Sequence, residues 1–208
     1  MVFQDREEAG KKLGKELVAR DLEADIVLAI PRGGLPLGRE VADALDTELD
    51  VIVASKIGSP GNPELAIGAA ASDGSYWLNE ELIDRMGVDQ EFIDEAIEKE
   101  AENAREKLEF MRGEEELPEM GGKQVVVVDD GVATGSTAIA CLRHIRDAGA
   151  EKVVLAVPVG PRDTRERLAD EADEIVVLET PKAFGAVGRH YRDFEQVTDE
   201  AAREYLET

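Results

Sequence analysis

The residues best suited to chemistry stand in one continuous run, VVVVDDGVATGST, from Val125 to Thr137. Its four valines predict a strand covered on both faces, and the carboxylates of Asp129 and Asp130 follow where that strand ends. A turn of small and hydroxyl-bearing residues then opens a helix, and it comprises Ala133, Thr134, Gly135, Ser136 and Thr137. A helix N-terminus offers unpaired N–H groups and a partial positive charge of about +0.5, so this turn is typical of a phosphate site.

Asp129 and Asp130 predict what lies next to the phosphate in the same site. They would repel the phosphate itself, but a few ångströms away they could accept hydrogen bonds from the vicinal hydroxyls of a sugar. Together, Asp129, Asp130 and the turn therefore predict a site for a phosphorylated ribose. The alternative is a plain capped turn with two solvated aspartates.

The elements that must position these residues follow from the apolar pattern. Apolar runs alternate with amphipathic stretches, as expected of βα units, so a parallel sheet is predicted. Strands are expected at 26–30, 51–55, 125–128, 153–157 and 175–178, a hairpin at 66–71 and 76–78, and helices at 5–22, 37–45 and 138–148. The Gly- and Pro-rich residues 56–63 are expected to form a mobile loop. The predicted fold class is α/β, with a three-layer, mostly parallel central sheet flanked by helices.

Two segments extend this core within what we interpret as a single domain, residues 1–208. Asn79 is a predicted helix cap, and Asp89 to Met111 read as a long charged helix, so residues 79–112 are interpreted as a helical insertion. Residues 181–208 hold several of the few aromatic side chains and are interpreted as a C-terminal cap segment that could close over a cleft.

Composition narrows the classes of function. Asp and Glu number 47 against 24 Lys and Arg, and the net charge of -23 argues against nucleic-acid and membrane-surface partners. Acidic residues spread along the whole chain favour a halophilic source, with an ordinary acidic protein as the alternative. The N-terminus lacks the pattern of a secretory peptide, so a cytoplasmic location is expected. One cysteine and two histidines exclude thiolate and histidine-rich zinc sites, and no side chain is assigned as a metal ligand.

The run from Asp129 to Thr137 resembles the phosphoribosyl-pyrophosphate (PRPP) binding motif of the type I phosphoribosyltransferases. The order of elements from about Ile26 to Leu178 is compatible with the core of that family. The resemblance implies that Asp129 and Asp130 hold the ribose hydroxyls and that Ala133 to Thr137 wrap the 5′-phosphate.

The same resemblance gives roles to two further segments. Arg32, Gly33 and Gly34 follow the first core strand, where the family binds pyrophosphate, although PRGG is also ordinary turn chemistry. Residues 56–68 stand at the place of the flexible catalytic loop, so Lys56 could meet the pyrophosphate and Glu64 could act as acid or base. The alternative for this loop is a simple connector.

The activity that the resemblance implies is transfer of ribose 5-phosphate from PRPP to a nitrogenous base, with Mg²⁺ bound mainly through PRPP. The alternative is a non-catalytic protein on the same fold that senses PRPP or a nucleotide. Ala133 stands where hypoxanthine–guanine enzymes carry an aspartate, and KIGSPGNPELAIGA and AVGRHYRDF resemble predicted phosphoribosyltransferases of unassigned acceptor. His190 and Tyr191 in that tail could stack on a base or simply pack on the core. A homodimer is compatible with the resemblance.

Overall fold

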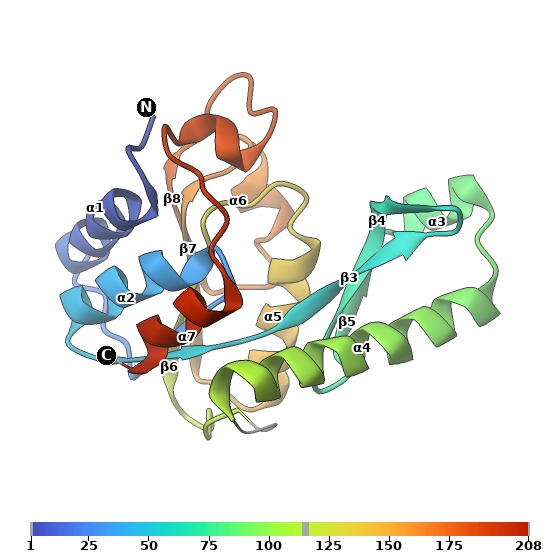
Figure 1. Ribbon diagram of the computed structural model, residues 1–208, viewed down its shortest axis with the longest axis horizontal. Helices are drawn as coiled ribbons and strands as arrows, with labels where there is room; N and C mark the ends of the chain where they lie inside the picture. The colour runs from blue at the N-terminus through green and yellow to red at the C-terminus, as the bar shows by residue number, and fades with distance from the viewer. Residues whose placement is uncertain (1, 114–116, 208) are drawn as a thin grey trace.

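The computed structural model describes residues 2–113 and 117–207. Its body is a five-stranded sheet in which every neighbouring pair of strands is parallel (Figure 1). The strand order is β2 (Glu48–Val51), β1 (Ile26–Ala29), β6 (Gln124–Val128), β7 (Lys152–Val159) and β8 (Glu174–Glu179). The predicted α/β class with a parallel central sheet is confirmed.

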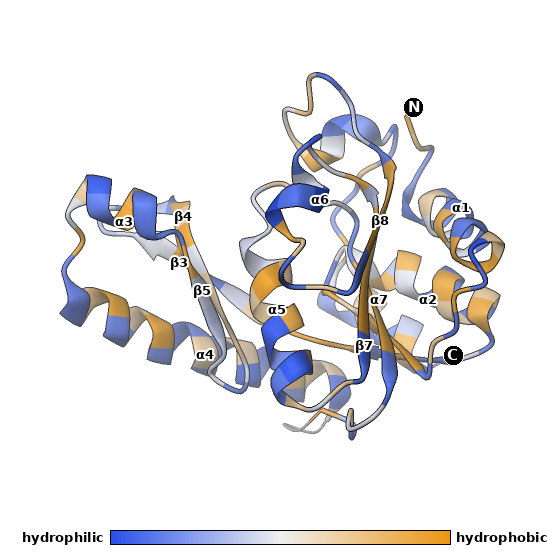
Figure 2. Cartoon of the chain, turned by 180° about the vertical axis from the view of Figure 1, so that it is seen from behind, coloured by the Kyte–Doolittle hydropathy of each residue, from blue (hydrophilic) through white to orange (hydrophobic). Residues whose placement is uncertain are grey.

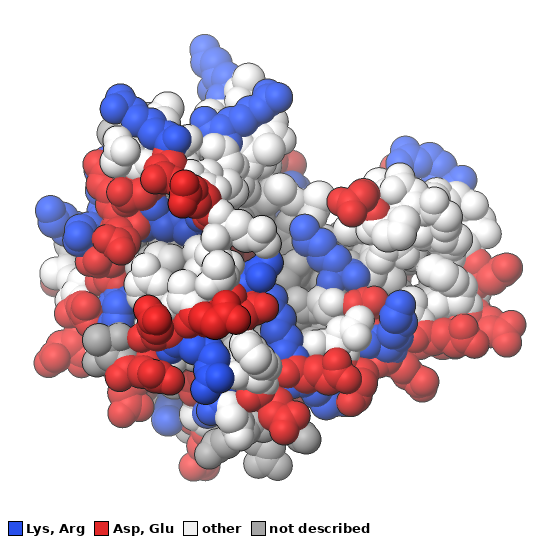
Figure 3. All heavy atoms as spheres, viewed as in Figure 1, with Lys and Arg blue, Asp and Glu red and all other residues white. Residues whose placement is uncertain are grey.

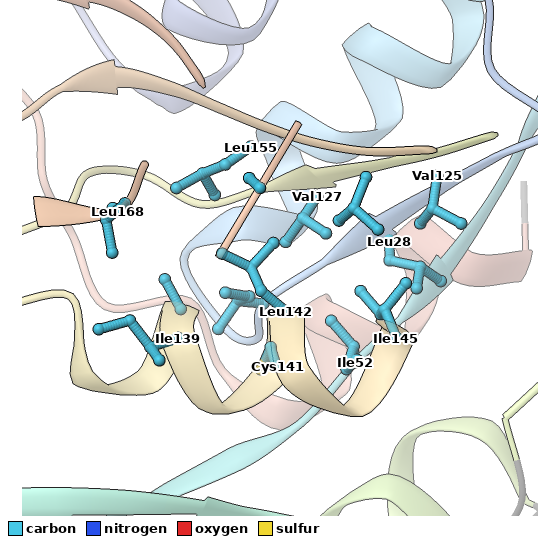
Figure 4. Packing of buried hydrophobic residues seen from close by; sticks show 14 of the residues in the cluster. Leu28, Ile52, Val125, Val127, Ile139, Cys141, Leu142, Ile145, Leu155 and Leu168 are labelled. Atoms are coloured by element: carbon cyan, nitrogen blue, oxygen red, sulfur yellow. The ribbon is translucent and has the colours of Figure 1, made fainter. Parts of the chain in front are cut away.

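Helices cover both faces of this sheet because its strands are apolar on both sides. Helices α1 (Arg6–Ala19) and α2 (Gly34–Leu45) lie on one face, and α5 (Ser136–Asp147) lies on the other (Figure 2). Val126 and Val128 pack toward α1 and α2, whereas Val125 and Val127 face α5. Figure 4 shows the second contact, with side chains of α5 against β1, β6 and β7. The four valines are therefore covered on both faces, as predicted.

A smaller sheet and two helices form an arm that extends from this body (Figure 1). The sheet has the antiparallel order β3 (Ala54–Ser59), β4 (Asn62–Ala71) and β5 (Tyr76–Leu78). The helices are α3 (Glu80–Met86), which Asn79 caps as predicted, and α4 (Gln90–Arg112). The hairpin predicted at 66–71 and 76–78 is confirmed by the pairing of β4 with β5.

Two predictions about the start of the arm are wrong. The single strand expected at 51–55 does not form, because β2 ends at Val51 and β3 begins at Ala54 in the other sheet. Ile52 and Val53, which connect the two sheets, are almost fully buried without being in a strand. The apolar run therefore reflects burial of this connection. Residues 56–63, the expected loop, form the outer part of the β3–β4 hairpin: the end of β3, the turn at Pro60 and Gly61, and the start of β4.

Glycine makes this hairpin possible despite its loop-like composition. A side chain on Gly58 would lie 2.7 Å from the backbone of Pro63 on the facing strand. The ladder is irregular at the same place, with register shifts on either side of Gly58. Gly and Pro therefore mark a bulge in a paired strand here, where composition alone suggested an unpaired loop.

The chain returns to the body at its C-terminal end. A short α6 (Thr164–Arg167) precedes β8, and after β8 come a 3₁₀ turn, η1 (Val187–His190), and α7 (Asp199–Glu207). A β-bridge joins Phe3 to Tyr191, so this segment also meets the N-terminus. Among the described residues, no helix is both long enough and apolar enough to cross a bilayer.

Candidate functional site

A pocket of about 290 Å³ opens at the carboxyl edge of the parallel sheet. Residues from several distant segments line it: Asp129 to Ala138 after β6, Ile30, Pro31 and Gly33 after β1, Lys56 from β3, and Val187 from η1. In open α/β sheets, ligands bind outside the carboxyl ends of the strands. A cavity of about 340 Å³ lies on the arm between the β3–β4 hairpin and α4, and it contains none of the predicted site residues.

The turn after β6 is built to approach a ligand closely. Gly135 caps α5 with a φ of 85°, in the left-handed region that favours glycine. The hydroxyls of Thr134 and Ser136 lie 2.8 Å apart. Arg167 donates hydrogen bonds to the backbone carbonyls of Ala133 and Thr134. The carbonyls are thereby satisfied by the protein, while the first N–H groups of α5 have no partner within their own helix.

Asp129 and Asp130 lie in the pocket with contrasting surroundings. Burial raises the pKa of Asp129 well above its ordinary value, and the neighbouring Asp130 raises it further. Burial also raises the pKa of Asp130, but the guanidinium of Arg6 opposes that shift. Nε and Nη2 of Arg6 both lie 2.9 Å from Oδ2 of Asp130. Among the described residues, one cation therefore contacts this pair of carboxylates directly. It is Arg6, and it contacts Asp130.

The turn after β1 packs tightly against these aspartates. A side chain on Gly34 would lie 2.7 Å from the backbone oxygen of Val128, and one on Gly33 would lie 2.1 Å from Oδ2 of Asp130. Both glycines are needed because the turn crosses directly over the end of β6. Arg32 does not line the pocket; its Nη1 lies 3.4 Å from Oδ1 of Asp199 on α7.

Lys56 and Glu64, the two site residues predicted within 56–68, lie on different strands of the β3–β4 hairpin. Lys56 on β3 lines the pocket, and its charge lowers the pKa of Asp129. Glu64 lies in the exposed first half of β4 and does not line the pocket. The structure thus brings the two aspartates, the turn after β6, Gly33 and Lys56 together around one pocket. Gly34 packs against the end of β6, Arg32 lies outside the lining, and Glu64 is remote from it.

Comparison with known proteins places the chain in a family. Residues 4–192 match the family model described as phosphoribosyl transferase domain. The chain belongs to the phosphoribosyl transferase family. The type I fold expected from the motif is thereby confirmed as well.

Similar proteins support the assignment of this chain to the phosphoribosyl transferase family. It is 42% identical over 207 residues to "Putative phosphoribosyl transferase Rv0571c" of Mycobacterium tuberculosis, covering 99% of this chain but 46% of the relative. The chain thus spans about half the length of that curated relative. TT1426 of Thermus thermophilus is 40% identical, with a TM-score of 0.81 over 99% of this chain and 98% of that one. AQ2163 of Aquifex aeolicus, 17% identical with a TM-score of 0.51, covers 97% and 85% respectively and shares the fold.

Sequence reasoning missed three contacts at this pocket. Arg6 pairs with Asp130, and the hydroxyl of Tyr191 donates to the backbone oxygen of Asp130 at 2.6 Å. Lys107 on α4 lies 3.4 Å from the backbone oxygen of Pro31, and burial lowers its pKa. Arg6 and Lys107 gave no signal because each stands in a charged amphipathic helix among similar residues.

The aromatic tail of the family domain is largely structural. His190 is buried, bonds to the backbone oxygen of Phe184 at 2.8 Å and stacks on the ring of Phe184. Tyr191 packs on Phe3 and Phe194. Of the two interpretations of these residues, packing on the core is confirmed.

The donor atoms around the pocket decide which metal ion could fit there. No three His, Cys, Asp or Glu side chains lie close enough to hold a metal within the described ranges 2–113 and 117–207. The pocket does offer carboxylate and hydroxyl oxygens, the donors that Mg²⁺ prefers, and Mg²⁺ usually keeps several waters and is bound partly by substrate phosphates. The donor set therefore fits a Mg²⁺ ion that arrives with a phosphorylated substrate.

Proposed function

We propose that the protein transfers a ribose-5-phosphate group from PRPP to a nitrogenous base and releases pyrophosphate. The observation that supports this best is the pocket itself. It joins a helix N-terminus, two adjacent carboxylates and a glycine turn, three features suited to a phosphate, a sugar diol and a second phosphate group. Membership of the phosphoribosyl transferase family supports the same reaction class.

Each part of the donor has a matching part of the pocket. The 5′-phosphate would take the first N–H groups of α5 and the hydroxyls of Thr134, Ser136 and Thr137. The ribose hydroxyls would donate to Asp129 and Asp130. The pyrophosphate would lie against Gly33 and Gly34 with Lys56, and Arg32 would have to leave Asp199 to reach it.

The same residues would stabilise the charges that develop during the reaction. Breaking the glycosidic bond builds positive charge on the sugar, which nearby carboxylates stabilise. Lys56 and Arg32 would stabilise the negative charge of the departing pyrophosphate. When bound with PRPP, Mg²⁺ would neutralise phosphate charge and orient the leaving group. The nucleophile must be the base, so water has to be excluded before the bond breaks.

The test is release of pyrophosphate from PRPP and Mg²⁺ with a panel of purine, pyrimidine and other nitrogenous acceptors, in about 1 M potassium chloride. Turnover that requires one acceptor and disappears in Asp129→Asn supports the proposal. Asp147→Asn, on the far end of α5, is the matched control and should retain turnover.

Two other outcomes would replace the proposal. Tight binding of PRPP with no turnover for any acceptor favours a sensor of PRPP on the same fold. Failure of PRPP and Mg²⁺ to bind at all would show that the donor is wrong. Isothermal calorimetry on the same samples separates these two results.

A further inference from the structure

The first residue of α1 reaches the candidate site from the opposite end of the chain. Arg6 is separated from Asp130 by 124 residues, yet its Nε and Nη2 both lie 2.9 Å from Oδ2 of that carboxylate. Only 12% of the Arg6 side chain and 15% of the Asp130 side chain are exposed. This is a largely buried ion pair in the wall of the pocket.

The Arg6 guanidinium is held on its other sides as well. Its Nη1 donates to the backbone oxygen of Glu195 at 2.7 Å, and its Cζ lies 3.8 Å from the centre of the Phe194 ring. Asp5 caps α1 by accepting a hydrogen bond from the N–H of Glu8, and this cap fixes the position of the backbone at Arg6. A planar guanidinium fixed in this way can hold a carboxylate in one orientation.

We infer that Arg6 is a positioning residue: it keeps Asp130 ionised and turns one carboxylate oxygen toward the ligand. This inference rests on the proposed function. The hydrogen bond from Nε and the ion-pair contact from Nη2 of Arg6 both end on Oδ2, and Oδ1 accepts no hydrogen bond from the described part of the chain. Oδ1 is therefore the atom that can accept from a ribose hydroxyl.

The charge state of Asp130 needs this support because its surroundings oppose ionisation. Ionisable groups from several elements interact with the aspartate pair. They are Arg6 from α1, Lys56 from β3, Lys107 from α4, Cys141 from α5, and Tyr191, whose hydroxyl donates to the backbone oxygen of Asp130. Burial raises the pKa of Asp130, and Arg6 is the cation that lowers it. Without Arg6, more Asp130 is protonated near neutral pH, and a protonated carboxyl is a poorer acceptor for a hydroxyl.

A purely structural role for Arg6 makes a different prediction. Arg6 also joins α1 to the C-terminal segment through Glu195 and Phe194, so its loss could loosen the fold. Such loosening would weaken ligand binding by a similar factor at every pH. A change in the charge of Asp130 would weaken binding mainly at low pH.

The experiment compares Arg6→Met, which keeps an apolar stem, with Arg6→Lys, which keeps the charge. Arg112→Met is the matched control, since Arg112 Nε lies 2.8 Å from Asp50 Oδ1 in a pair of similar exposure, 14% and 17%. Affinity for PRPP with Mg²⁺ is measured by calorimetry from about pH 6 to pH 9. The carboxyl ¹³C signal of Asp130, assigned with Asp130→Asn, is followed over the same range without ligand.

We expect Arg6→Met to bind PRPP roughly tenfold or more weakly than wild type near pH 6. It should recover most of that loss near pH 9, because the protonated fraction of Asp130 falls as the pH rises. Arg6→Lys should lie between the two, and Arg112→Met should follow wild type. The ¹³C midpoint of Asp130 should rise in Arg6→Met. An equal loss of affinity at all pH values, or an unchanged ¹³C midpoint, overturns the inference. If wild type fails to bind PRPP, the proposed function is wrong, and the ¹³C titration still decides the charge state.

Discussion

Asp129 and Asp130 are neighbours of the same type, and burial raises the pKa of both, but only Asp130 has a cation in direct contact. Nη2 of Arg6 lies 2.9 Å from Oδ2 of Asp130, and the guanidinium opposes the rise in the pKa of Asp130. Asp129 forms no ion pair with the described residues, and burial and the charge of Asp130 raise its pKa well above the ordinary value. Ionised Asp129 therefore lowers the stability of the fold at neutral pH, which is common where a site is arranged for a ligand.

Asp129→Asn should raise the free energy of unfolding by about 1 kcal/mol at pH 7. Asparagine removes the buried charge and can still accept the hydrogen bond from the N–H of Asp130. The pKa is raised on folding, so the folded state binds the proton more tightly and wild type loses stability as pH rises through that window. The gain should shrink toward about pH 4, where wild type is protonated in the folded state. Urea unfolding at both pH values tests this, and an equal gain at both contradicts it.

Asp130→Asn should have the opposite effect on stability. It removes the anionic partner of Arg6, whose guanidinium is largely buried, so we expect a loss of about 1–3 kcal/mol at pH 7. The same urea experiment measures it. A stabilised Asp130→Asn would mean that the Arg6 pair contributes nothing to the fold.

Gly33→Ala should abolish PRPP binding while leaving the protein folded. The added Cβ would meet Oδ2 of Asp130, so the carboxylate would have to leave Arg6. The matched control is Gly121→Ala, since nothing lies within 4 Å of a Cβ built on Gly121. Calorimetry with PRPP and a thermal unfolding scan measure both effects. If Gly33→Ala binds PRPP like wild type, this turn does not set the position of Asp130.

At the scale of elements, the β3–β4 hairpin decides how the arm can take part in the reaction. Lys56 lies at its inner end, in the pocket, and Glu64 lies toward its exposed outer end. The register shifts around Gly58 lie between them. A bend at Gly58 is therefore the simplest motion that would bring Glu64 nearer the pocket and exclude water.

If the hairpin bends in this way, Glu64→Gln should lower kcat by about tenfold or more, the lower range for loss of an acid or base. Affinity for PRPP should not change, because Glu64 does not line the pocket. Glu81→Gln, an exposed carboxylate of α3 on the same arm, is the control. Steady-state pyrophosphate release gives kcat, and calorimetry gives the affinity. An unchanged kcat in Glu64→Gln would remove Glu64 from the mechanism.

At the scale of the whole molecule, charge is the dominant feature. The chain carries a net charge of -23, and Figure 3 shows acidic and basic side chains interspersed over both body and arm on the face in view. The described ion pairs neutralise some of these charges locally, and mutual repulsion among the remaining carboxylates opposes the compact state.

Raising potassium chloride from about 0.1 M to 1 M should therefore raise the unfolding midpoint by at least about 2–4 °C. Salt shortens the distance over which carboxylates repel one another. An equal concentration of sucrose is the control, since it strengthens burial without screening charge. Scanning calorimetry measures both. A midpoint that stays flat or falls in salt would argue against a halophilic design.

Local patterns predicted most of the sheet and the phosphate turn. The valines before Asp129 and the glycine of the helix cap lie next to one another in sequence, so strand, turn and helix could be assigned together. The hairpin at 56–63 has the composition of a loop because Gly58 and Pro63 suit either state. Only their packing against each other, across a paired strand, distinguishes the two.

By itself, the sequence determined the α/β class and the motif of Asp129 to Thr137, since both depend on neighbouring residues and on strand or helix periodicity. The tertiary structure decided which charges meet there. Arg6 and Lys107 reach the site from helices far away in the chain. Other basic residues of the same helices have partners elsewhere: Lys11 pairs with Glu40, Arg105 donates to the backbone oxygen of Ser72, and Arg112 pairs with Asp50. The roles of Arg6 and Lys107 depend on contacts over 124 and 76 residues, and such contacts form only when the sheet brings its carboxyl edge against both helices.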